Sequence, residues 1–346
     1  MEGKDESMTD SHIEKTDGEQ LSEKLSFSLK SCWEKASEAE KTEIYAFSEK
    51  YKSFLDKSRT PQLFINNCTS DFINYGFIDF ESFCKNKNII PGTGIYQTLK
   101  GKSIFFVIPG KQPISSGVNI ICSHIDSPHI GLKSNPLYEN SDLAFFDTHY
   151  YGGIKYYQWA AIPLIMAGTI IDKDGIKKQI QLGSNDNEPV FTITDLLPHL
   201  AEDQMKKNAA EFIDAEGLDI LIGSEPYQDK KITDKVKINI LNILYNKYGI
   251  DEKSFTHIDI SFVPAFNARD VGFDHSMIGA HGHDDKCCAF ALLQAALKFT
   301  SHIVNKTSPP EKAIIGIFVD NEEVGGYRPY LQHFKYFLQA FCPALH

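Results

Sequence analysis

Three short apolar runs constrain the fold of this chain more than any other feature of its sequence. They are rich in β-branched and aromatic residues, as buried strands are, and they span Ser103–Pro109 (SIFFVIP), Val118–Ile125 (VNIICSHI) and Ala313–Val319 (AIIGIFV). A helical stretch, Lys286–Phe299 (KCCAFALLQAALKF), precedes the last run. Strands that alternate with helical stretches build α/β folds, so we predict an α/β core around a largely parallel or mixed sheet.

The composition limits the binding partners and the cellular compartment that we expect for this protein. A formal net charge of −11 argues against a nucleic-acid partner held through its phosphates and against docking to anionic membranes. No apolar run is long enough to span a bilayer. The N-terminal segment MEGKDESMTDSHIEKTDGEQ lacks the basic start and apolar stretch of a secretion signal. We therefore expect a cytoplasmic protein with no nucleic-acid and no membrane partner.

The cysteines agree with a reducing compartment. There are seven of them, they form no CxxC pair, and several lie in apolar runs. This usage predicts reduced, mostly buried thiols rather than a disulfide scaffold.

The pattern of apolar and polar residues changes twice along the chain, which predicts an inserted domain. Helix is expected over Leu21–Leu55 with a break near Ser37. The alternating segments Lys177–Leu182 and Val190–Ile193, followed by a charged helical region around Glu202–Phe212, differ in character from the sequence on either side. The predicted divisions are a disordered acidic tail over 1–25, a core domain over 26–139, an inserted β-rich domain over 140–261, and the second part of the core over 262–346.

The first polar cluster, His124–Pro128 (HIDSP), stands where an apolar run stops. Sites in open α/β sheets gather at the carboxyl ends of strands. An imidazole that binds a metal needs an acceptor for its second ring nitrogen, and Asp126 is suitably placed two residues later. The alternative is a histidine and an aspartate in an ordinary turn.

The second cluster, Gly282–Lys286 (GHDDK), directly precedes the helical stretch. Aspartate is a favoured helix N-cap, so one of the two acids needs no further explanation. The other, beside His281 and His283, is a candidate for a carboxylate that bridges two cations.

The third cluster, Asp320–Gly325 (DNEEVG), closes the last apolar run. Its acidic residues fit two interpretations, a solvated turn and a metal site. Adjacent glutamates point in different directions, so one can face a cation while the other takes a proton from water. Taken together, the three clusters supply His, Asp and Glu ligands without cysteine, which suits zinc, manganese or cobalt.

These motifs resemble the signatures of the M18 metallopeptidases, the aspartyl aminopeptidase family, in its bacterial rather than its animal branch. The resemblance runs from about Ala46 to Gly325. Further similarity lies in Tyr150–Trp159 (YYGGIKYYQW), Thr192–Leu200 (TITDLLPHL) and Ala268–Asp274 (ARDVGFD).

The resemblance implies a mixed-sheet metallopeptidase catalytic domain with an inserted dimerisation domain, and it implies roles for particular residues. His124 is a ligand of one of two divalent metal ions and Asp126 orients it. Asp284 bridges the two metals and Glu323 binds the other one. Glu322 is the general base. The family builds dimers that assemble into a dodecamer, and His199 is similar to the histidine that reaches a neighbouring subunit's site.

The sequence also departs from the family pattern. Two further family ligands, an Asp and a His, come later in such enzymes. No Asp or Glu follows Glu323 here, and His333 and His346 lie in unfamiliar contexts. Each metal would keep only two protein ligands, fewer than a catalytic zinc site usually has. We therefore expect a truncated or frameshifted chain that hydrolyses aminoacyl substrates poorly. His129 also replaces the Arg that commonly follows Ser-Pro.

The function expected from the sequence is that of a zinc-dependent aminopeptidase, which removes N-terminal residues from peptides with a water activated by two metals. Two alternatives stay open. One is a catalytically inactive remnant that acts through its dimerisation surface. The other is an unrelated acidic α/β binding protein, which would not need all three clusters to converge.

Overall fold

The computed structural model describes residues 15–86, 88, 90–172, 174–300, 308–325 and 328–339, with the side chains of 328–333 excepted. The chain divides into two compact units, residues 1–49 and 50–346. Residues 1–14 of the predicted acidic tail lie outside the described residues.

The first unit is helical. It contains α1 (Asp17–Leu25), α2 (Cys32–Lys35) and the beginning of α3 (Glu38–Lys57), and no residue of α1 or α2 is buried. Helix α1 occupies part of the predicted disordered tail because Thr16 and Glu19 form a capping box, which satisfies backbone groups at its start. The predicted break near Ser37 is confirmed: Ser37 and Glu40 exchange the same pair of hydrogen bonds at the start of α3. Residues 26–31 are not helical, although the sequence predicted helix there.

The second unit contains a five-stranded mixed sheet with the order β1-β2-β3-β14-β4. Its strands are β1 (Ile78–Asp79), β2 (Ile95–Leu99), β3 (Ser103–Ile108), β4 (Val118–His124) and β14 (Ala313–Val319). Strand β14 runs antiparallel to β3 and parallel to β4. The predicted mixed α/β class is therefore confirmed, as are the three strands expected from the apolar runs.

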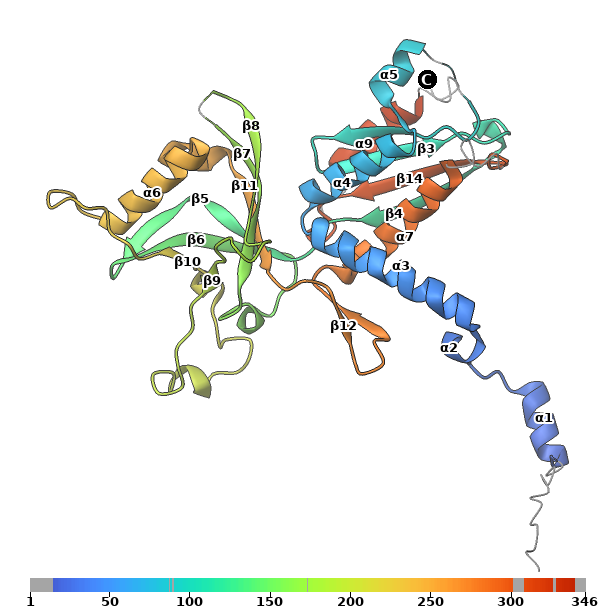
Figure 1. Ribbon diagram of the computed structural model, residues 1–346, viewed down its shortest axis with the longest axis horizontal. Helices are drawn as coiled ribbons and strands as arrows, with labels where there is room; N and C mark the ends of the chain where they lie inside the picture. The colour runs from blue at the N-terminus through green and yellow to red at the C-terminus, as the bar shows by residue number, and fades with distance from the viewer. Residues whose placement is uncertain are drawn as a thin grey trace, which may run out of the picture. The chain divides into compact units, whose positions relative to one another are not determined.

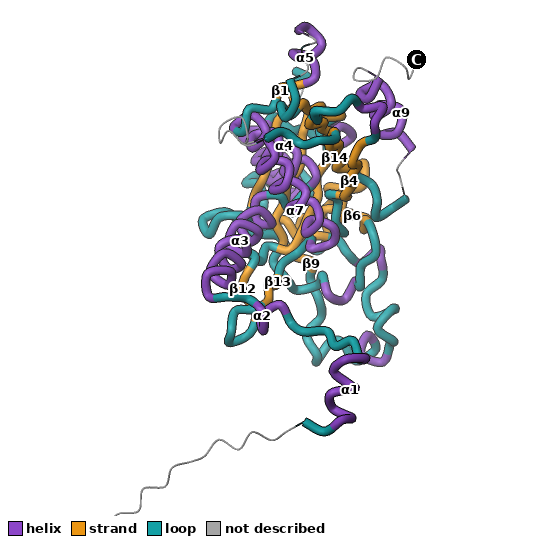
Figure 2. The backbone as a smooth tube through the Cα atoms, turned by 90° about the vertical axis from the view of Figure 1, so that its right-hand side faces the viewer, coloured by secondary structure: helices purple, strands orange, loops and turns teal. Residues whose placement is uncertain are grey.

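Helices cover both faces of this sheet (Figures 1 and 2). On one face, Phe106 packs in a core with α4 (Pro61–Asn74) and α7 (His283–Thr300). On the other face, Phe105 packs with Phe83 of α5 (Phe80–Asn86) and Phe337 of α9 (Arg328–Gln339). Because both faces of β3 are covered, its sequence is continuously apolar rather than alternating.

Strand β4 lies at the edge of the sheet, and this corrects the prediction that it is buried. Ile120 and Ile121 are 52% and 45% exposed. An apolar run of this length predicts a strand, but its burial depends on which neighbours pair with it and cover it.

The predicted burial of the cysteines was wrong for the same reason, whereas the prediction of free thiols holds for the six described ones. Of the six described cysteines only Cys68 is buried, whereas the others are exposed and all six are free. Cys122 lies on the edge strand, and Cys287 and Cys288 lie on α7.

A seven-stranded sheet follows, with the order β8-β7-β11-β5-β6-β10-β9. Its neighbouring strands are all antiparallel. They are β5 (His129–Asn140), β6 (Leu143–Tyr151), β7 (Leu164–Ile171), β8 (Lys177–Leu182), β9 (Thr192–Ile193), β10 (Ile220–Gly223) and β11 (Asp259–Pro264). Helix α6 (Lys235–Tyr248) packs on it (Figure 1). The sheet takes strands from 129 to 264, and the boundaries 140 and 261 of an inserted domain stay a prediction.

The remaining segments are short. A small hairpin pairs β12 (Arg269–Val271) with β13 (Met277–Gly279). The helix predicted around Glu202–Phe212 is absent from this described segment, which holds only a 3-10 turn at Gln204–Lys206. Met205 there is 63% exposed, so the segment has little apolar surface with which to anchor a helix. Within the described ranges, none of the helices combines the length and the apolar content that crossing a bilayer requires.

The close contact of β14 with β3 leads to a prediction about stability. A Cβ atom on Gly316 would lie 1.9 Å from the Phe106 ring, so Gly316→Ala must displace a buried aromatic side chain. We expect a loss of about 1–3 kcal/mol in the free energy of unfolding, measured by urea denaturation. The same substitution at Gly153, where nothing lies within 4 Å of the added atom, is the control. Equal losses for the two variants would contradict the packing argument.

Candidate metal centre

The first and third polar clusters meet because β4 and β14 are parallel neighbours. His124 is the last residue of β4 and pairs with Val319, the last residue of β14. The carboxyl ends of the two strands therefore lie side by side, and Asp126 and Glu322 follow from the same edge of the sheet. The start of α7 brings in the second cluster, so that Asp284 reaches His124. The structure thus brings together the five residues that the sequence assigned to the centre: His124, Asp126, Asp284, Glu322 and Glu323.

The carboxylate of Asp126 is fully buried and joins these segments. Its Oδ2 accepts hydrogen bonds from the Tyr151 hydroxyl at 2.7 Å and from the backbone N–H of Glu323 at 3.1 Å. Its Oδ1 accepts from the backbone N–H of Glu322 at 3.3 Å. A buried carboxylate is costly unless donors surround it, and here donors from two other segments do so.

Asp126 also positions the imidazole of His124. The Nδ1 atom lies 3.2 Å from the Asp126 backbone oxygen and 3.3 Å from Oδ1 of its carboxylate. Burial alone would lower the pKa of His124. The carboxylates of Asp126, Asp284 and Glu322 outweigh burial, so that the pKa is raised.

The opposite ring nitrogen of His124 faces acids. Its Nε2 lies 3.1 Å from Oδ1 of Asp284 and 3.7 Å from Oε2 of Glu322. When Nδ1 carries the proton that it donates to Asp126, Nε2 presents a lone pair to two carboxylates, which is repulsive unless a proton or a cation lies between them. The 3.1 Å separation is close to the roughly 3.4 Å between two ligands of one tetrahedral zinc ion. This nitrogen and oxygen donor set therefore fits a divalent cation.

Asp284 and Asp285 begin α7 with non-helical backbone angles, joined by a cis peptide bond. The side chain of Asp284 is 88% exposed, while its backbone oxygen accepts a hydrogen bond from the Ser127 hydroxyl at 3.2 Å. The carboxylate of Asp285 instead accepts from the Ser123 hydroxyl at 3.0 Å. One aspartate therefore extends toward His124 and the other is held against β4.

Lys286 is a structural residue of the centre that the sequence reasoning missed. Its side chain is fully buried and its Nζ donates a hydrogen bond to the Ser127 hydroxyl, so Ser127 links Lys286 to Asp284. Burial lowers the pKa of Lys286 to about 8 in spite of the charges of Asp126 and Glu323. One signal could have revealed it: Lys286 begins the apolar stripe that continues with Ala289, Phe290 and Leu293, where a solvated lysine does not belong.

The two glutamates begin a tight turn, in which the backbone N–H of Gly325 donates to the Glu322 carbonyl at 2.9 Å. Asn321 adopts a left-handed conformation with φ 68°, which asparagine tolerates better than most residues. This turn presents the backbone of Glu322 and Glu323 to Asp126. Burial raises the pKa of Glu323, and the nearby acids, Asp126 first among them, raise it further.

Tyr151 and Gly152, at the end of β6, were part of a family motif but had no role in the sequence analysis. A Cβ atom on Gly152 would lie 2.9 Å from Oε2 of Glu323, and the residue has a left-handed φ of 74°. Only glycine meets both conditions without strain. Two adjacent glycines directly after an aromatic strand were the available signal for a close approach of the backbone.

The structure does not bring His199 to this centre within the chain. It lies in an exposed turn at 198–200, and among the described residues no hydrogen bond or ion pair joins it to the cluster. The side chain of His333 and all of His346 lie outside the described residues.

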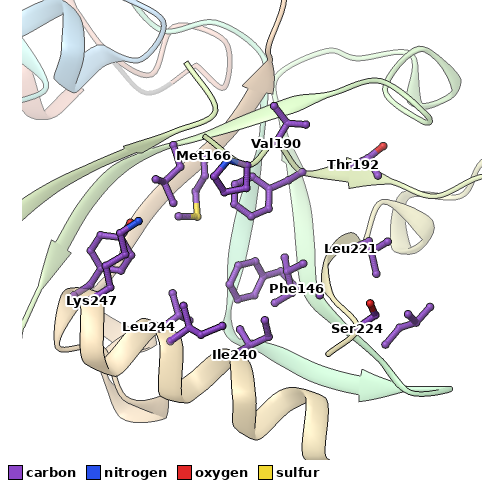
Figure 3. Close-up of a pocket in the computed structure, with 17 residues that line it drawn as sticks. Phe146, Met166, Val190, Thr192, Leu221, Ser224, Ile240, Leu244 and Lys247 are labelled. Carbon is purple, nitrogen blue, oxygen red and sulfur yellow. The ribbon is translucent and has the colours of Figure 1, made fainter. Parts of the chain in front are cut away.

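A separate apolar cavity of about 480 Å³ lies between α6 and the seven-stranded sheet (Figure 3). Phe146, Met166 and Leu244 line it, and no acid or histidine is among its lining residues. Hydrolytic chemistry requires groups that move protons or hold cations, so the centre at the ends of β4 and β14 is the candidate site.

A mixed-sheet α/β fold that gathers an imidazole and several carboxylates at its strand ends is the arrangement of a metal-binding class of protein. The family described as Aminopeptidase I zinc metalloprotease (M18) matches residues 54–328, and the chain belongs to this family. A probable M18 family aminopeptidase 1 from Borrelia garinii subsp. bavariensis is 45% identical over 294 residues. The match covers 85% of this chain and 62% of that protein, so the chain spans less than two thirds of the length of this curated relative.

Solved structures agree with the fold. Aminopeptidase I from Clostridium acetobutylicum superposes with a TM-score of 0.81 and 35% identity, over 91% of this chain and 69% of that one. The mApe1 dodecamer of Saccharomyces cerevisiae, 17% identical with a TM-score of 0.62 over 85% of this chain and 66% of that one, shares the fold alone.

The hydrogen bonds of Asp126 lead to a second prediction. Tyr151→Phe removes the donor that lies 2.7 Å from the buried carboxylate and leaves that oxygen with one hydrogen bond fewer. We expect a loss of about 1.5–3 kcal/mol in the free energy of unfolding, measured by urea denaturation. Tyr157→Phe removes a hydroxyl from a tyrosine that is 38% exposed, and it should leave stability nearly unchanged. A Tyr151→Phe variant as stable as the Tyr157→Phe control would show that Asp126 does not depend on this bond.

A third prediction concerns the stability of the chain at acidic pH. His129 stacks on Tyr151 with ring centroids 4.3 Å apart, and burial lowers its pKa to about 4. Since the ordinary value is near 6.5, the unfolded chain binds more protons than the folded one between about pH 6.5 and pH 4, and stability is lost as pH falls through this window. At pH 5 the histidine accounts for a loss of about 2 kcal/mol relative to pH 7.

The His129→Asn variant isolates this contribution. Its loss of unfolding free energy between pH 7 and pH 5 should be smaller than that of the unaltered chain by about 2 kcal/mol. His199→Asn, at an exposed position, should show the unaltered loss. Parallel pH profiles for His129→Asn and the unaltered chain would contradict the assignment.

Proposed function

We propose that this chain is a zinc-dependent aminopeptidase that hydrolyses N-terminal residues from peptides. Membership of the M18 zinc metalloprotease family supports the reaction class. The observation that carries the proposal is the convergence on Asp126, which orients His124 and holds the backbone of Glu322 and Glu323, so that one imidazole and several carboxylates face one another.

His124, Asp284 and Glu323 would hold two divalent ions, with zinc as the natural choice and manganese or cobalt as alternatives. Asp284 is the candidate bridging ligand, because its exposed carboxylate already meets Nε2 of His124. A divalent cation bound there polarises a carbonyl group and lowers the pKa of water. Asp126 keeps the proton of His124 on Nδ1, which leaves Nε2 available as a ligand.

Glu322 is the candidate general base. Its carboxylate lies 3.7 Å from Nε2 of His124 and is 41% exposed, so water and a peptide can reach it. Its backbone is held by Asp126. In this role the carboxylate accepts a proton from the attacking water and returns it to the leaving amine.

The partners proposed are peptide substrates and further copies of the chain. The yeast structure is a dodecamer, and this supports a homo-oligomer. That the oligomer is built from dimers through residues 140–261 is part of the proposal. His199 is proposed to reach a neighbouring subunit's site, in keeping with its exposed position. A cytoplasmic location without nucleic-acid or membrane partners stays our expectation from the sequence. No observation on the described residues favours an inactive remnant.

Glu322→Gln tests the proposal. It removes the proton acceptor but keeps the shape of the side chain, and it should lower zinc-dependent release of N-terminal residues from peptides by about 10²–10⁴-fold while zinc binding, measured by calorimetry, is largely retained. Glu81→Gln alters a glutamate that is 82% exposed on α5, and it should change neither quantity. Absence of zinc-dependent release by the unaltered chain, or full activity of Glu322→Gln, would refute the proposal.

A further inference from the structure

A second group of ligand atoms lies at the beginning of α7. It consists of the thiols of Cys287 and Cys288 and the carboxylate of Asp285, and one ligand atom from each lies within 4.8 Å of the other two. We call these three residues the dithiol site. None of them is among the ligands proposed above, and the inference below does not depend on the proposed peptidase activity.

We propose that the dithiol site binds a thiophilic divalent cation of the zinc and cadmium class. The two sulfur atoms are 4.0 Å apart. Two thiolates on one tetrahedral zinc ion, with zinc–sulfur distances of about 2.3 Å, are separated by about 3.8 Å. The pair is thus close to the spacing that a shared cation requires, and the Asp285 carboxylate supplies a third ligand by a small movement.

The local backbone explains why these three groups converge. Asp285 directly precedes the regular helical part of α7, which carries Cys287 and Cys288. Asp285 has non-helical angles, and its carboxylate is held by the Ser123 hydroxyl at 3.0 Å. Cys287 lies beside Cys288, and both thiols are exposed. A cation can therefore enter from solvent, and a fourth coordination position stays open.

A disulfide between the two cysteines fits their geometry less well than a shared cation does. Adjacent Cα atoms are about 3.8 Å apart across a trans peptide, below the usual range for disulfides. Such a bond would have to distort the helix in which both residues lie. A cation needs only side-chain rotation. It would displace the thiol protons, since coordinated thiols are deprotonated.

The test uses cadmium alone, added to the purified, metal-depleted chain, with the ultraviolet charge-transfer absorption of cadmium–thiolate bonds as the readout. We expect saturation at one thiolate-bound ion per chain. Cys287→Ser and Cys288→Ser should each abolish the band or weaken apparent affinity at least tenfold, and Asp285→Asn should weaken it about tenfold or more. Cys84→Ser, which removes an exposed cysteine on α5, is the matched control and should leave the titration unchanged.

His124→Ala separates this inference from the proposed function. That variant lacks a ligand of the candidate metal centre and should keep the cadmium–thiolate band. A band that is absent from the unaltered chain, persists in both cysteine variants, or disappears in Cys84→Ser would overturn the dithiol site. Circular dichroism checks folding of each variant. If a cysteine variant does not fold, the unaltered chain is treated with an alkylating reagent in the presence and absence of cadmium. Cadmium should protect Cys287 and Cys288 from alkylation, and unprotected thiols would refute the site.

Discussion

The centre depends on one buried negative charge. A carboxylate as deeply buried as that of Asp126 costs several kcal/mol unless hydrogen bonds compensate for the lost water. Its donors come from Tyr151 at the end of β6 and from the backbone after β14, and its own strand-end partner is His124. The hydrogen bonds to this single carboxylate therefore connect segments that lie far apart in sequence.

A second connection passes through Ser127. Its hydroxyl accepts a hydrogen bond from the buried Lys286 and donates one to the backbone of Asp284. Lys286 thus lies near the charges of Asp126 and Glu323, and Ser127 connects it to the backbone of Asp284. The candidate ligands are thus held in place by hydrogen bonds from residues around them, as the ligands of metal sites commonly are. The same helix start presents the dithiol site to solvent, with Asp285 turned away from Asp284 by its contact with Ser123.

Much of the fold could be predicted because it follows from local pattern. Strands β3 and β14 are apolar on both faces and end close to the predicted residues, and α7 follows its own apolar stripe. The failures share one physical cause. Whether Ile120, Cys122 or Cys288 is buried depends on which elements cover it, and a segment's own sequence carries no information about its neighbours. The charged segment near Met205 was predicted as helix from composition, but without apolar contacts to a core a short helix is only marginally stable.

The sequence by itself determined the order of chemical groups along the chain and the ends of the strands that carry them. His124 lies at the end of one apolar run and Asp320 directly follows another. Only the tertiary structure decided that these two strands are parallel neighbours, that Tyr151 and Lys286 approach Asp126 and Ser127, and that Asp285 meets Cys287 and Cys288. The reason is physical: hydrogen bonds and the burial of charge act between segments brought together by packing, and their partners are fixed by distance in space rather than by distance along the chain.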